Sequence, residues 1–439
     1  MTTPICDFVE KYKEKNPMRF HMPGHKGKSY LGFEEYDITE VTGADSLFSP
    51  SGIIKESEEN ASNIFSAHTF FSCEGSTLSI KAMVFLCSLW AKENNRKNKI
   101  LALRNAHKAF LYACALTDTD VLWLKGNDST YLSCSVTPEE IENTIKTEKD
   151  LPSAIYVTSP DYLGNIADLC TIKHICIKYN ILLIVDNAHG AYLNFIGTHP
   201  LKMGADMVTD SAHKTLSCLT GAGYLHINKN APEILKSNAK YAMEIFSSTS
   251  PSYLILQSLD KFNSLAQSFA SRLNYFLPFT GFIKEKLIEH GYTLYGNEPL
   301  KITIKTKPYG YSGYELGRIL ENKNVYPEFY DADFIVFMLP ISKDALMNLA
   351  EILFSIPKRE PITSAPPCFT MPTKEMSIRE AVFSPFEEVN IEDSLNRILS
   401  APTVSCPPAV PIVVSGEKIT KDAIEVFKYY GVEKLKVVK

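Results

Sequence analysis

The sequence has no long basic run, no Cys-x-x-Cys pair, and no apolar stretch near the ~20 residues that a membrane span needs. With a formal net charge of -5, it shows no electrostatic footprint for nucleic acid or an anionic membrane surface. Its 10 cysteines are scattered singly, which favours reduced thiols over a disulfide framework, and we expect no metal site. The first residues lack the basic and apolar regions of a signal peptide, so we expect a cytoplasmic protein.

The composition predicts a globular chain with a large buried core, because 45% of its 439 residues are hydrophobic. A domain holds roughly 100–200 residues, so we expect two or three lobes. Short β-branched runs alternate with helix-length segments, which is typical of an α/β fold with a mostly parallel central sheet. Buried parallel strands are expected at residues 100–103, 121–124, 154–158, 181–185, 206–210 and 223–227. Helices are expected between them at residues 76–94, 137–146 and 169–179.

The pattern changes after a long helical stretch at residues 252–290. A smaller α+β lobe follows, with a strand at 301–306, a helix at 312–322, a strand pair within 325–339 and a helix at 343–355. A proline-rich joint then leads to a strand-like run at 412–414 and a last helix. We therefore predict an N-terminal arm (1–60), a large domain (61–290), a small domain (291–360) and a C-terminal segment (361–439).

Polar side chains follow two strands that are neighbours in the chain. Asp186 and His189 follow the most apolar strand, and Lys214 follows the next one. Ligands of an open parallel sheet gather at the carboxyl ends of its strands. Taken singly, such residues are ordinary loop residues, but a lysine together with an acid is the minimum equipment for pyridoxal phosphate. Ala188 has the small side chain expected beneath a flat ring, although an ordinary packing role fits it equally well.

Two further segments suit the same cofactor. Gly75, Ser76 and Thr77 open an apolar helix, where backbone N–H groups and hydroxyls suit a phosphate, although a plain helix cap is an equal interpretation. His107 follows the strand at 100–103 and could stack on a ring, although a loop histidine with ordinary hydrogen bonds is the more common case.

Several motifs in the same order resemble the Orn/Lys/Arg basic amino acid decarboxylases of pyridoxal-phosphate fold type I, especially their short bacterial form. The matching stretches are FHMPGHKG (20–27), DITEVTGADSLFSPSG (37–52), SPDYLGNIADL (159–169), IVDNAHGAY (184–192), SAHKTL (211–216), STSPSYLILQSLD (248–260) and CPPAVPIVVSGE (406–417). Together they cover nearly the full length of the chain.

The resemblance implies decarboxylation of arginine, lysine or ornithine to the amine and carbon dioxide in polyamine biosynthesis, with arginine slightly favoured. Lys214 aligns with the Schiff-base lysine, Asp186 with the partner of the pyridine nitrogen, and His107 with the imidazole that stacks opposite Ala188. The aligned phosphate positions are Gly75, Ser76, Thr77, Ser211 and His213. Lys214, His189 or a neighbouring acid would return the proton to the substrate. The family builds its active sites between subunits, so we expect a homodimer or larger homo-oligomer, with residues 248–250 reaching the neighbouring cofactor.

Some positions depart from the family pattern and leave the substrate open. They are Glu74, Asn187, Gly221, Cys406 and Ala409. Acidic candidates for the distal substrate cation are Glu328, Asp331 and Glu380, for each of which a solvated surface role is the commoner one. Two rival functions stay open, an aminotransferase of the same fold and a non-catalytic regulatory paralog. Retention of Lys214 argues against the paralog.

Overall fold

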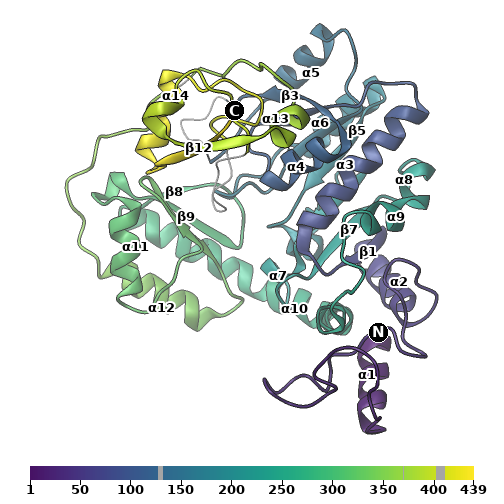
Figure 1. Ribbon diagram of the computed structural model, residues 1–439. Coiled ribbons are helices and arrows are strands. Elements are labelled where there is room, and N and C mark those ends of the chain that lie inside the picture. Colours follow the sequence, from purple (N-terminus) through teal and green to yellow (C-terminus); the bar gives the residue numbers. More distant parts are fainter. Residues whose placement is uncertain (127–131, 369, 402–410) are drawn as a thin grey trace. The chain divides into compact units, whose positions relative to one another are not determined.

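The computed structural model describes residues 1–126, 132–368, 370–401 and 411–439 (Figure 1). The chain forms two compact units. The first consists of Met1–Leu101, Glu142–Val157 and Asp168–Ala270, and the second of Ala102–Ile141, Thr158–Ala167 and Ser271–Lys439. The division into an arm, a large domain, a small domain and a C-terminal segment stays a prediction.

A seven-stranded sheet confirms the predicted α/β class, with the strand order β1-β7-β6-β5-β4-β2-β3. Its strands are β1 (His68–Ser72), β2 (Lys99–Leu103), β3 (Asp120–Leu124), β4 (Ala154–Thr158), β5 (Leu182–Asp186), β6 (Met207–Asp210) and β7 (Gly223–Ile227). Every residue of β5 is buried, as expected for a strand of a parallel sheet that is covered on both faces. Strands β5 and β6 pair in parallel, with Asp186 beside Thr209. This register places the two strand ends that carry the candidate residues next to each other.

The edge of the sheet differs from the prediction. Strand β7 runs antiparallel to β6, not parallel, and β1 pairs antiparallel with β7. Between β6 and β7 the chain forms only the one-turn helix α7 (Ala212–Thr215), which is too short to cross the sheet, so the chain reverses direction at the same edge. Strand β1 was not predicted.

Fourteen α-helices are described in the ranges given above. Before the small sheet they are α1 (Pro4–Glu14), α2 (Ile53–Phe65), α3 (Gly75–Glu93), α4 (Lys108–Thr117), α5 (Pro138–Thr147), α6 (Leu169–Tyr179), α7, α8 (Glu233–Ser237), α9 (Ala239–Glu244) and α10 (Tyr253–Glu289). The remainder are α11 (Gly313–Glu321), α12 (Lys343–Phe354), α13 (Ile378–Phe383) and α14 (Lys421–Tyr429). No helix within the described ranges has the length and apolarity needed to cross a membrane.

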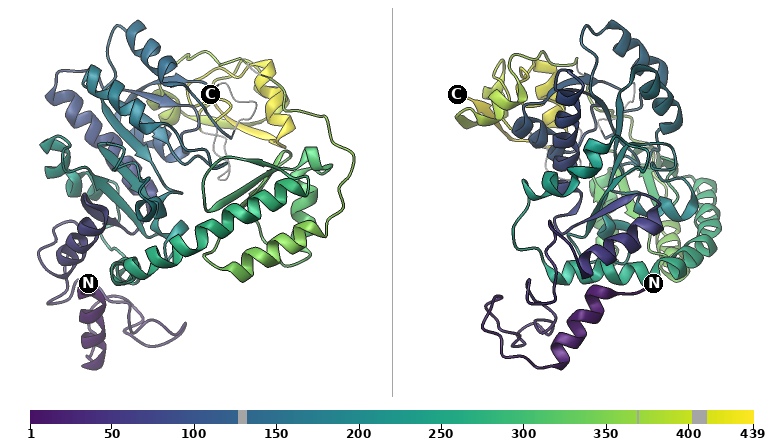
Figure 2. Two further views of the ribbon diagram at one scale, coloured as in Figure 1. Left: turned by 180° about the vertical axis from the view of Figure 1, so that it is seen from behind. Right: turned by 90° about the vertical axis from the view of Figure 1, so that its right-hand side faces the viewer.

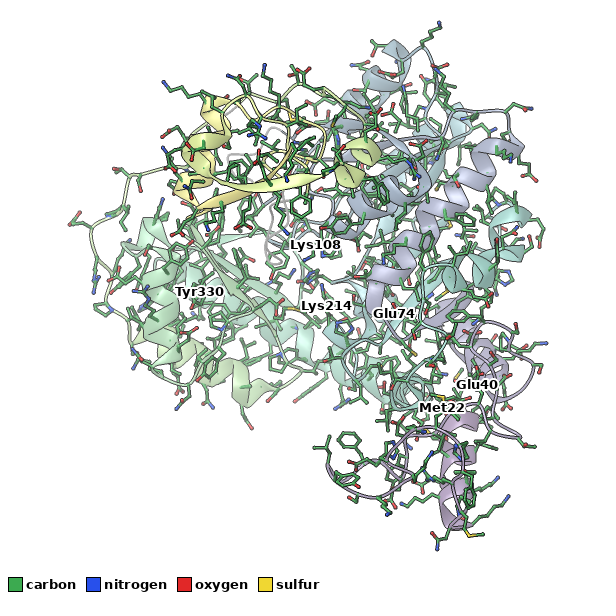
Figure 3. The ribbon with its side chains drawn as sticks, viewed as in Figure 1. Met22, Glu40, Glu74, Lys108, Lys214 and Tyr330 are labelled. Atoms are coloured by element: carbon green, nitrogen blue, oxygen red, sulfur yellow. The ribbon has the colours of Figure 1, made fainter. Side chains whose placement is uncertain are left out.

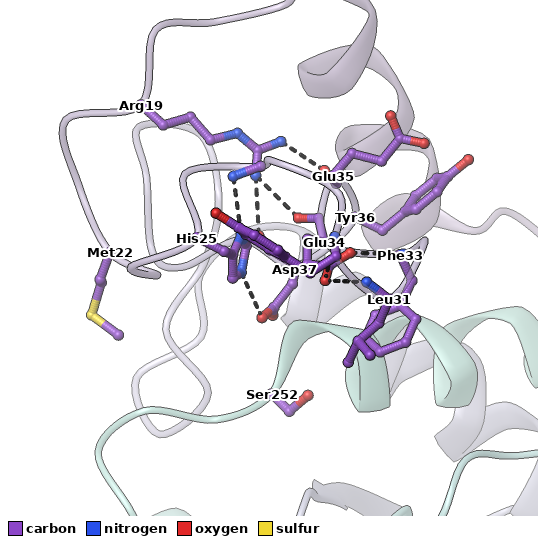
Figure 4. Close-up of polar contacts among 12 residues, drawn as sticks. Arg19, Met22, His25, Leu31, Phe33, Glu34, Glu35, Tyr36, Asp37 and Ser252 are labelled. Atoms are coloured by element: carbon purple, nitrogen blue, oxygen red, sulfur yellow. Dashed lines mark hydrogen bonds and ion pairs between the residues drawn. The ribbon is translucent and has the colours of Figure 1, made fainter.

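The N-terminal part of the first unit is held by charged side chains that bind backbone groups. The Asp260 carboxylate of α10 accepts hydrogen bonds from the Ile5 and Cys6 N–H groups at the start of α1 (3.1 and 2.9 Å), a favourable place for negative charge. In the loop after α1, the Glu34 carboxylate accepts from the N–H groups of four neighbouring residues, and Arg19 donates to three backbone carbonyls (Figure 4). These bonds hold together residues 30–37, which follow the FHMPGHKG stretch at 20–27.

The second unit contains a four-stranded sheet with the order β10-β11-β9-β8. The strands are β8 (Thr293–Tyr295), β9 (Lys301–Lys305), β10 (Phe329–Tyr330) and β11 (Phe334–Met338). With α11 and α12 this sheet matches the predicted smaller α+β lobe.

The C-terminal residues, whose ribbon is yellow in Figure 2, contain a separate apolar cluster in the second unit. Strands β12 (Phe386–Asn390) and β13 (Lys434–Val438), both unpredicted, pair antiparallel, and residues of α14 pack into the same cluster. The predicted strand at 412–414 is wrong. Backbone groups of this run form hydrogen bonds with side chains and, among the described residues, not with another strand. Arg104 donates to the Ile412 carbonyl, and the Val414 N–H donates to the Glu417 carboxylate. Cys406 and Ala409 lie outside the described residues.

A buried ion pair fixes this C-terminal cluster within its unit. Arg104, directly after β2, donates to both carboxylate oxygens of Glu417 at 2.7 and 2.6 Å, and the two side chains are only 3% and 4% exposed. Arg104 also donates to the carbonyls of Pro411 and Ile412. Removing one partner of such a pair leaves an uncompensated buried charge.

We predict that Arg104→Met lowers the free energy of unfolding by about 3–5 kcal/mol, because Glu417 is left charged and buried. Lys374→Met is the matched control. It breaks an ion pair with Asp120 whose side chains are 51% and 48% exposed, and should cost less than about 1 kcal/mol. Urea denaturation of both variants measures the difference, and equal losses would contradict the assignment.

Candidate active site

Lys214 and His189 are brought together in the first unit (Figure 3 labels Lys214). Lys214 is on α7, directly after β6, and its Nζ lies 3.0 Å from Nε2 of His189, in the turn after β5. His189 is buried, at 7% exposure, and Lys214 is half-buried. The two predicted residues therefore form an amine–imidazole pair between which a proton can pass.

Asp186 ends β5 and is 3% exposed. Its Oδ1 accepts a hydrogen bond from the Ala188 N–H at 3.1 Å, and its Oδ2 accepts from the Tyr156 hydroxyl at 3.0 Å. Charge-assisted hydrogen bonds of this kind fix the orientation of a buried carboxylate. Sequence reasoning missed Tyr156, because inside the apolar run of β4 it looks like an ordinary core residue.

The residues predicted to bind phosphate meet at the start of α3. Gly75, the first residue of the helix, has φ +62 and donates its N–H to the Gly221 carbonyl at 2.7 Å. The Ser211 hydroxyl, from the turn after β6, donates to the Ser76 hydroxyl at 2.9 Å. Thr77 is the next helical residue and its side chain is exposed. Two hydroxyls and the N-terminus of a 19-residue helix thus gather at one place, as an anion requires.

His213, a predicted phosphate-binding residue, and Glu74, which departs from the family pattern, both have structural partners. His213 shares a 2.8 Å hydrogen bond between its Nδ1 and the Ala222 carbonyl, so this nitrogen carries the proton. Glu74 is directed toward the loop after α9, where its Oε1 accepts from the Ser247 hydroxyl (2.6 Å) and the Ser248 N–H (2.9 Å). The Glu74 carboxylate thus binds the loop at residues 247–248.

The first unit thus holds chemically distinct groups that suit the three polar parts of pyridoxal phosphate. The Lys214 amine suits the carbonyl carbon, the Asp186 carboxylate suits a protonated ring nitrogen, and the hydroxyls of Ser76 and Ser211 suit the phosphate. Ala188 is small and buried beside Asp186. The residues present fit this cofactor.

His107 belongs to the second unit. It is the N-cap of α4, where its Nδ1 accepts a hydrogen bond from the Ala109 N–H at 3.1 Å. That contact explains its place at the start of the helix. Its predicted stacking on the cofactor ring stays a prediction.

The three acidic candidates for the substrate cation are also in the second unit, with different surroundings. Glu380 is exposed and forms a capping box with Ser377, whose N–H lowers the pKa of Glu380. Glu328 is exposed, accepts from the Tyr162 hydroxyl at 3.3 Å, and lines a cavity of about 350 Å³ beside α12. Asp331 is 3% exposed, and burial raises its pKa to about 6.

Comparison with known proteins agrees with this geometry. The chain matches the family model of the Orn/Lys/Arg decarboxylase major domain over residues 3–274 and that of the C-terminal domain over residues 363–435. It is 30% identical to the uncharacterized protein YaaO of Bacillus subtilis, covering 97% of this chain and 93% of that one. It is 28% identical to an arginine decarboxylase of Halalkalibacterium halodurans, covering 95% and 91%.

Among solved structures, lysine decarboxylase A from Pseudomonas aeruginosa superposes with a TM-score of 0.81, at 18% identity, covering 99% of this chain and 80% of that one. The fold is that of the fold type I pyridoxal-phosphate enzymes. Within that class, the chain belongs to the Orn/Lys/Arg decarboxylase family, as the resemblance of its motifs indicated. The family implies pyridoxal phosphate as the cofactor.

Proposed function

We propose that this enzyme decarboxylates a basic amino acid, arginine before lysine or ornithine, to the amine and carbon dioxide in polyamine biosynthesis. The observation that supports this most strongly is the placement of Asp186 and Lys214 at the carboxyl ends of adjacent parallel strands, with the Lys214 Nζ 3.0 Å from His189. We infer a cytoplasmic homodimer or larger homo-oligomer that acts on a small-molecule substrate, with no nucleic-acid or membrane partner. The charge, composition and family support this inference.

The roles of the residues follow from their contacts. Pyridoxal phosphate, when bound, supplies an electron sink for the electron pair that stays behind as the carboxylate leaves. Lys214 would hold its carbonyl carbon, and Gly75, Ser76, Thr77, Ser211 and His213 would line its phosphate. Asp186, held by Tyr156 and the Ala188 N–H, would pair with the ring nitrogen and favour its protonated form. His189 exchanges a proton with the Lys214 amine, which then returns it to the substrate carbon.

Selection of a basic side chain needs an acid that is shielded from water, because an exposed ion pair contributes only about 0–1 kcal/mol. Asp331 meets this condition better than the exposed Glu328 and Glu380. Its Oδ1 accepts from the N–H groups of Asp333 and Phe334, while its buried Oδ2 has no hydrogen-bond partner among the described residues. We therefore favour Asp331 as the partner of the substrate cation.

The first prediction here concerns the lysine. Borohydride reduction of cofactor-saturated protein should fix a pyridoxyl group on Lys214, located by peptide mapping, and Lys214→Ala should abolish the label. Lys202→Ala is the control, because this lysine of the same unit donates to the Asn194 carbonyl and should have no part in the label. A label on another lysine would show that the assignment is wrong.

The second prediction separates the charge of Asp186 from its orientation. Asp186→Asn should reduce turnover at least about 100-fold, because a neutral amide cannot hold a pyridinium charge. Tyr156→Phe should reduce it about tenfold, the value of a single hydrogen bond to a charged group. Turnover is measured at full cofactor occupancy. Tyr179→Phe, which removes a hydroxyl bonded to Glu142 on the surface, should behave like the parent, and equal effects of all three variants would contradict the roles.

The function itself is tested by incubation with arginine, lysine or ornithine, with measurement of carbon dioxide and identification of the amine. One of them should lose carbon dioxide without a keto acid. Asp331→Asn should lower kcat/KM for it at least about tenfold, a desolvated ion pair being worth more than an exposed one. Glu328→Gln and Glu380→Gln should stay near the parent. Amination of a keto acid without release of carbon dioxide would establish the aminotransferase. If the protein catalysed neither of the two reactions, the regulatory paralog would be favoured.

A further inference from the structure

A chain of buried polar side chains crosses four neighbouring strands of the first unit, and no step proposed above uses it. At its centre is Asp210, the last residue of β6, which is 0% exposed. Its Oδ2 lies 3.0 Å from Nε2 of His199 and 3.1 Å from Nε2 of His226 on β7, and its Oδ1 accepts from the Asn187 amide at 2.6 Å. His226 Nδ1 in turn lies 2.9 Å from the Thr69 hydroxyl on β1.

The proton positions follow from the partners of each ring. The Leu201 N–H donates to Nδ1 of His199 at 3.3 Å, so Nε2 carries the proton and donates to Asp210. Burial lowers the pKa of His226, which keeps this ring neutral. Its Nε2 carries the proton and donates it in the hydrogen bond to the Asp210 carboxylate. Burial raises the pKa of Asp210, but the interactions with His199 and His226 outweigh this effect and hold the pKa below its usual range. Asp210 is therefore a buried negative charge that accepts from three donors.

The same arrangement argues against a metal ion, although His199, Asp210 and His226 are close enough to hold one. A histidine that binds a metal through Nε2 normally donates a hydrogen bond from Nδ1. Nδ1 of His199 faces a backbone N–H and can only accept. Hydrogen bonding accounts for the geometry of the cluster better than coordination does.

Asp210 is linked in sequence and in space to the candidate active site. It directly precedes Ser211 and the turn that carries Lys214, and its partner Asn187 directly follows Asp186. The Asn187 N–H also donates to the Thr209 carbonyl at 3.0 Å, which extends the β5–β6 ladder past Asp186. The side-chain bond between Asn187 and Asp210 thus joins the two strand ends beyond their last regular backbone pairing.

We propose that Asp210 is a positioning residue, which through Asn187, His199 and His226 fixes Asp186 relative to the Lys214 turn and adds a negative charge behind it. This inference rests on the proposed function. An asparagine at position 210 would carry no charge and would have one acceptor oxygen for the three donors, so the Asn187 amide would have to turn its unpaired Oδ1 toward the new NH₂ group. The carboxylate, and not only its shape, is therefore needed.

The test compares Asp210→Asn with Thr69→Val in the holoenzyme. The valine variant removes only the outermost hydrogen bond of the chain and leaves every contact of Asp210 in place. Three quantities are measured besides the melting temperature: the dissociation constant of pyridoxal phosphate, the pH at which the absorption band of the bound cofactor changes, and kcat per bound cofactor. His189, Asp186 and His213 are titratable residues near Lys214 in space or in sequence, so their protonation states must be the same in the variants that are compared.

We expect Asp210→Asn to weaken cofactor binding about tenfold or more and to lower kcat per bound cofactor, because misplaced groups lose catalytic geometry. The pH of the absorption change should fall by about one unit, because a negative charge that favours the protonated form is lost. Thr69→Val should match the parent in all three quantities. Asn187→Ala, which keeps the charge and removes the link, should weaken cofactor binding without moving that pH.

Asp210→Asn could lower the melting temperature and leave unchanged the cofactor affinity, the pH of the absorption change and kcat per bound cofactor. The cluster would then have a purely structural role, and the proposal would be overturned. If Asp210→Asn does not fold, Asn187→Ala provides the test. The proposal is then overturned if Asn187→Ala binds pyridoxal phosphate as tightly as the parent does. A stoichiometric transition metal in the parent would overturn the assignment of hydrogen bonds. Absence of any borohydride-reducible cofactor on Lys214 of the parent is a separate outcome, which refutes the proposed function instead.

Discussion

The parallel pairing of β5 with β6 is the constraint on which the candidate site depends. It sets Asp186 beside Thr209, so that Asn187, directly after β5, lies next to the end of β6, where Asp210 is followed by Ser211. Because side chains alternate along a strand, a shift of one residue in this register would turn Asp186 away from its present face. The apolar strands thus determine where the charged groups lie, and the buried bonds of Asp210 reinforce that register where the backbone ladder ends.

The second unit depends on a different kind of interaction. Its C-terminal cluster has its own apolar core, and Arg104 binds both Glu417 and the carbonyls of the chain near residue 411. Two buried charges are costly to desolvate, so such a pair is weak evidence for net stability. A hydrophobic contact would tolerate sliding, whereas a bidentate guanidinium–carboxylate pair accepts one geometry. The family's C-terminal domain, residues 363–435, is therefore held in one position relative to the residues that follow β2 within this unit.

The sequence predicts the parts of the fold that alternate clearly between apolar strands and helices, and it predicts strand-end residues such as Lys214 and Asp186 because parallel strands end at one rim. It could not predict that β7 reverses direction, since an apolar run is the same in either orientation. Tyr156 and His226 were missed for a related reason. Both lie within buried strands, where only the partners of the hydroxyl or the imidazole, set by the three-dimensional packing, distinguish them from ordinary core residues.

Burial of Asp331 bears on the proposal that this residue selects a basic substrate. An acid whose pKa rises to about 6 on folding binds more protons in the folded than in the unfolded chain between about pH 4 and 6. Stability therefore falls as pH rises through that window, and at neutral pH the fold carries the cost of a desolvated, ionised carboxylate. Lys307 offsets part of this cost through its charge. A substrate guanidinium or ammonium group that reached the second oxygen would offset more of it, whereas a neutral side chain would offset none. Selectivity for a cation would then arise from an unfavourable charge already present in the free enzyme, in addition to the new contact.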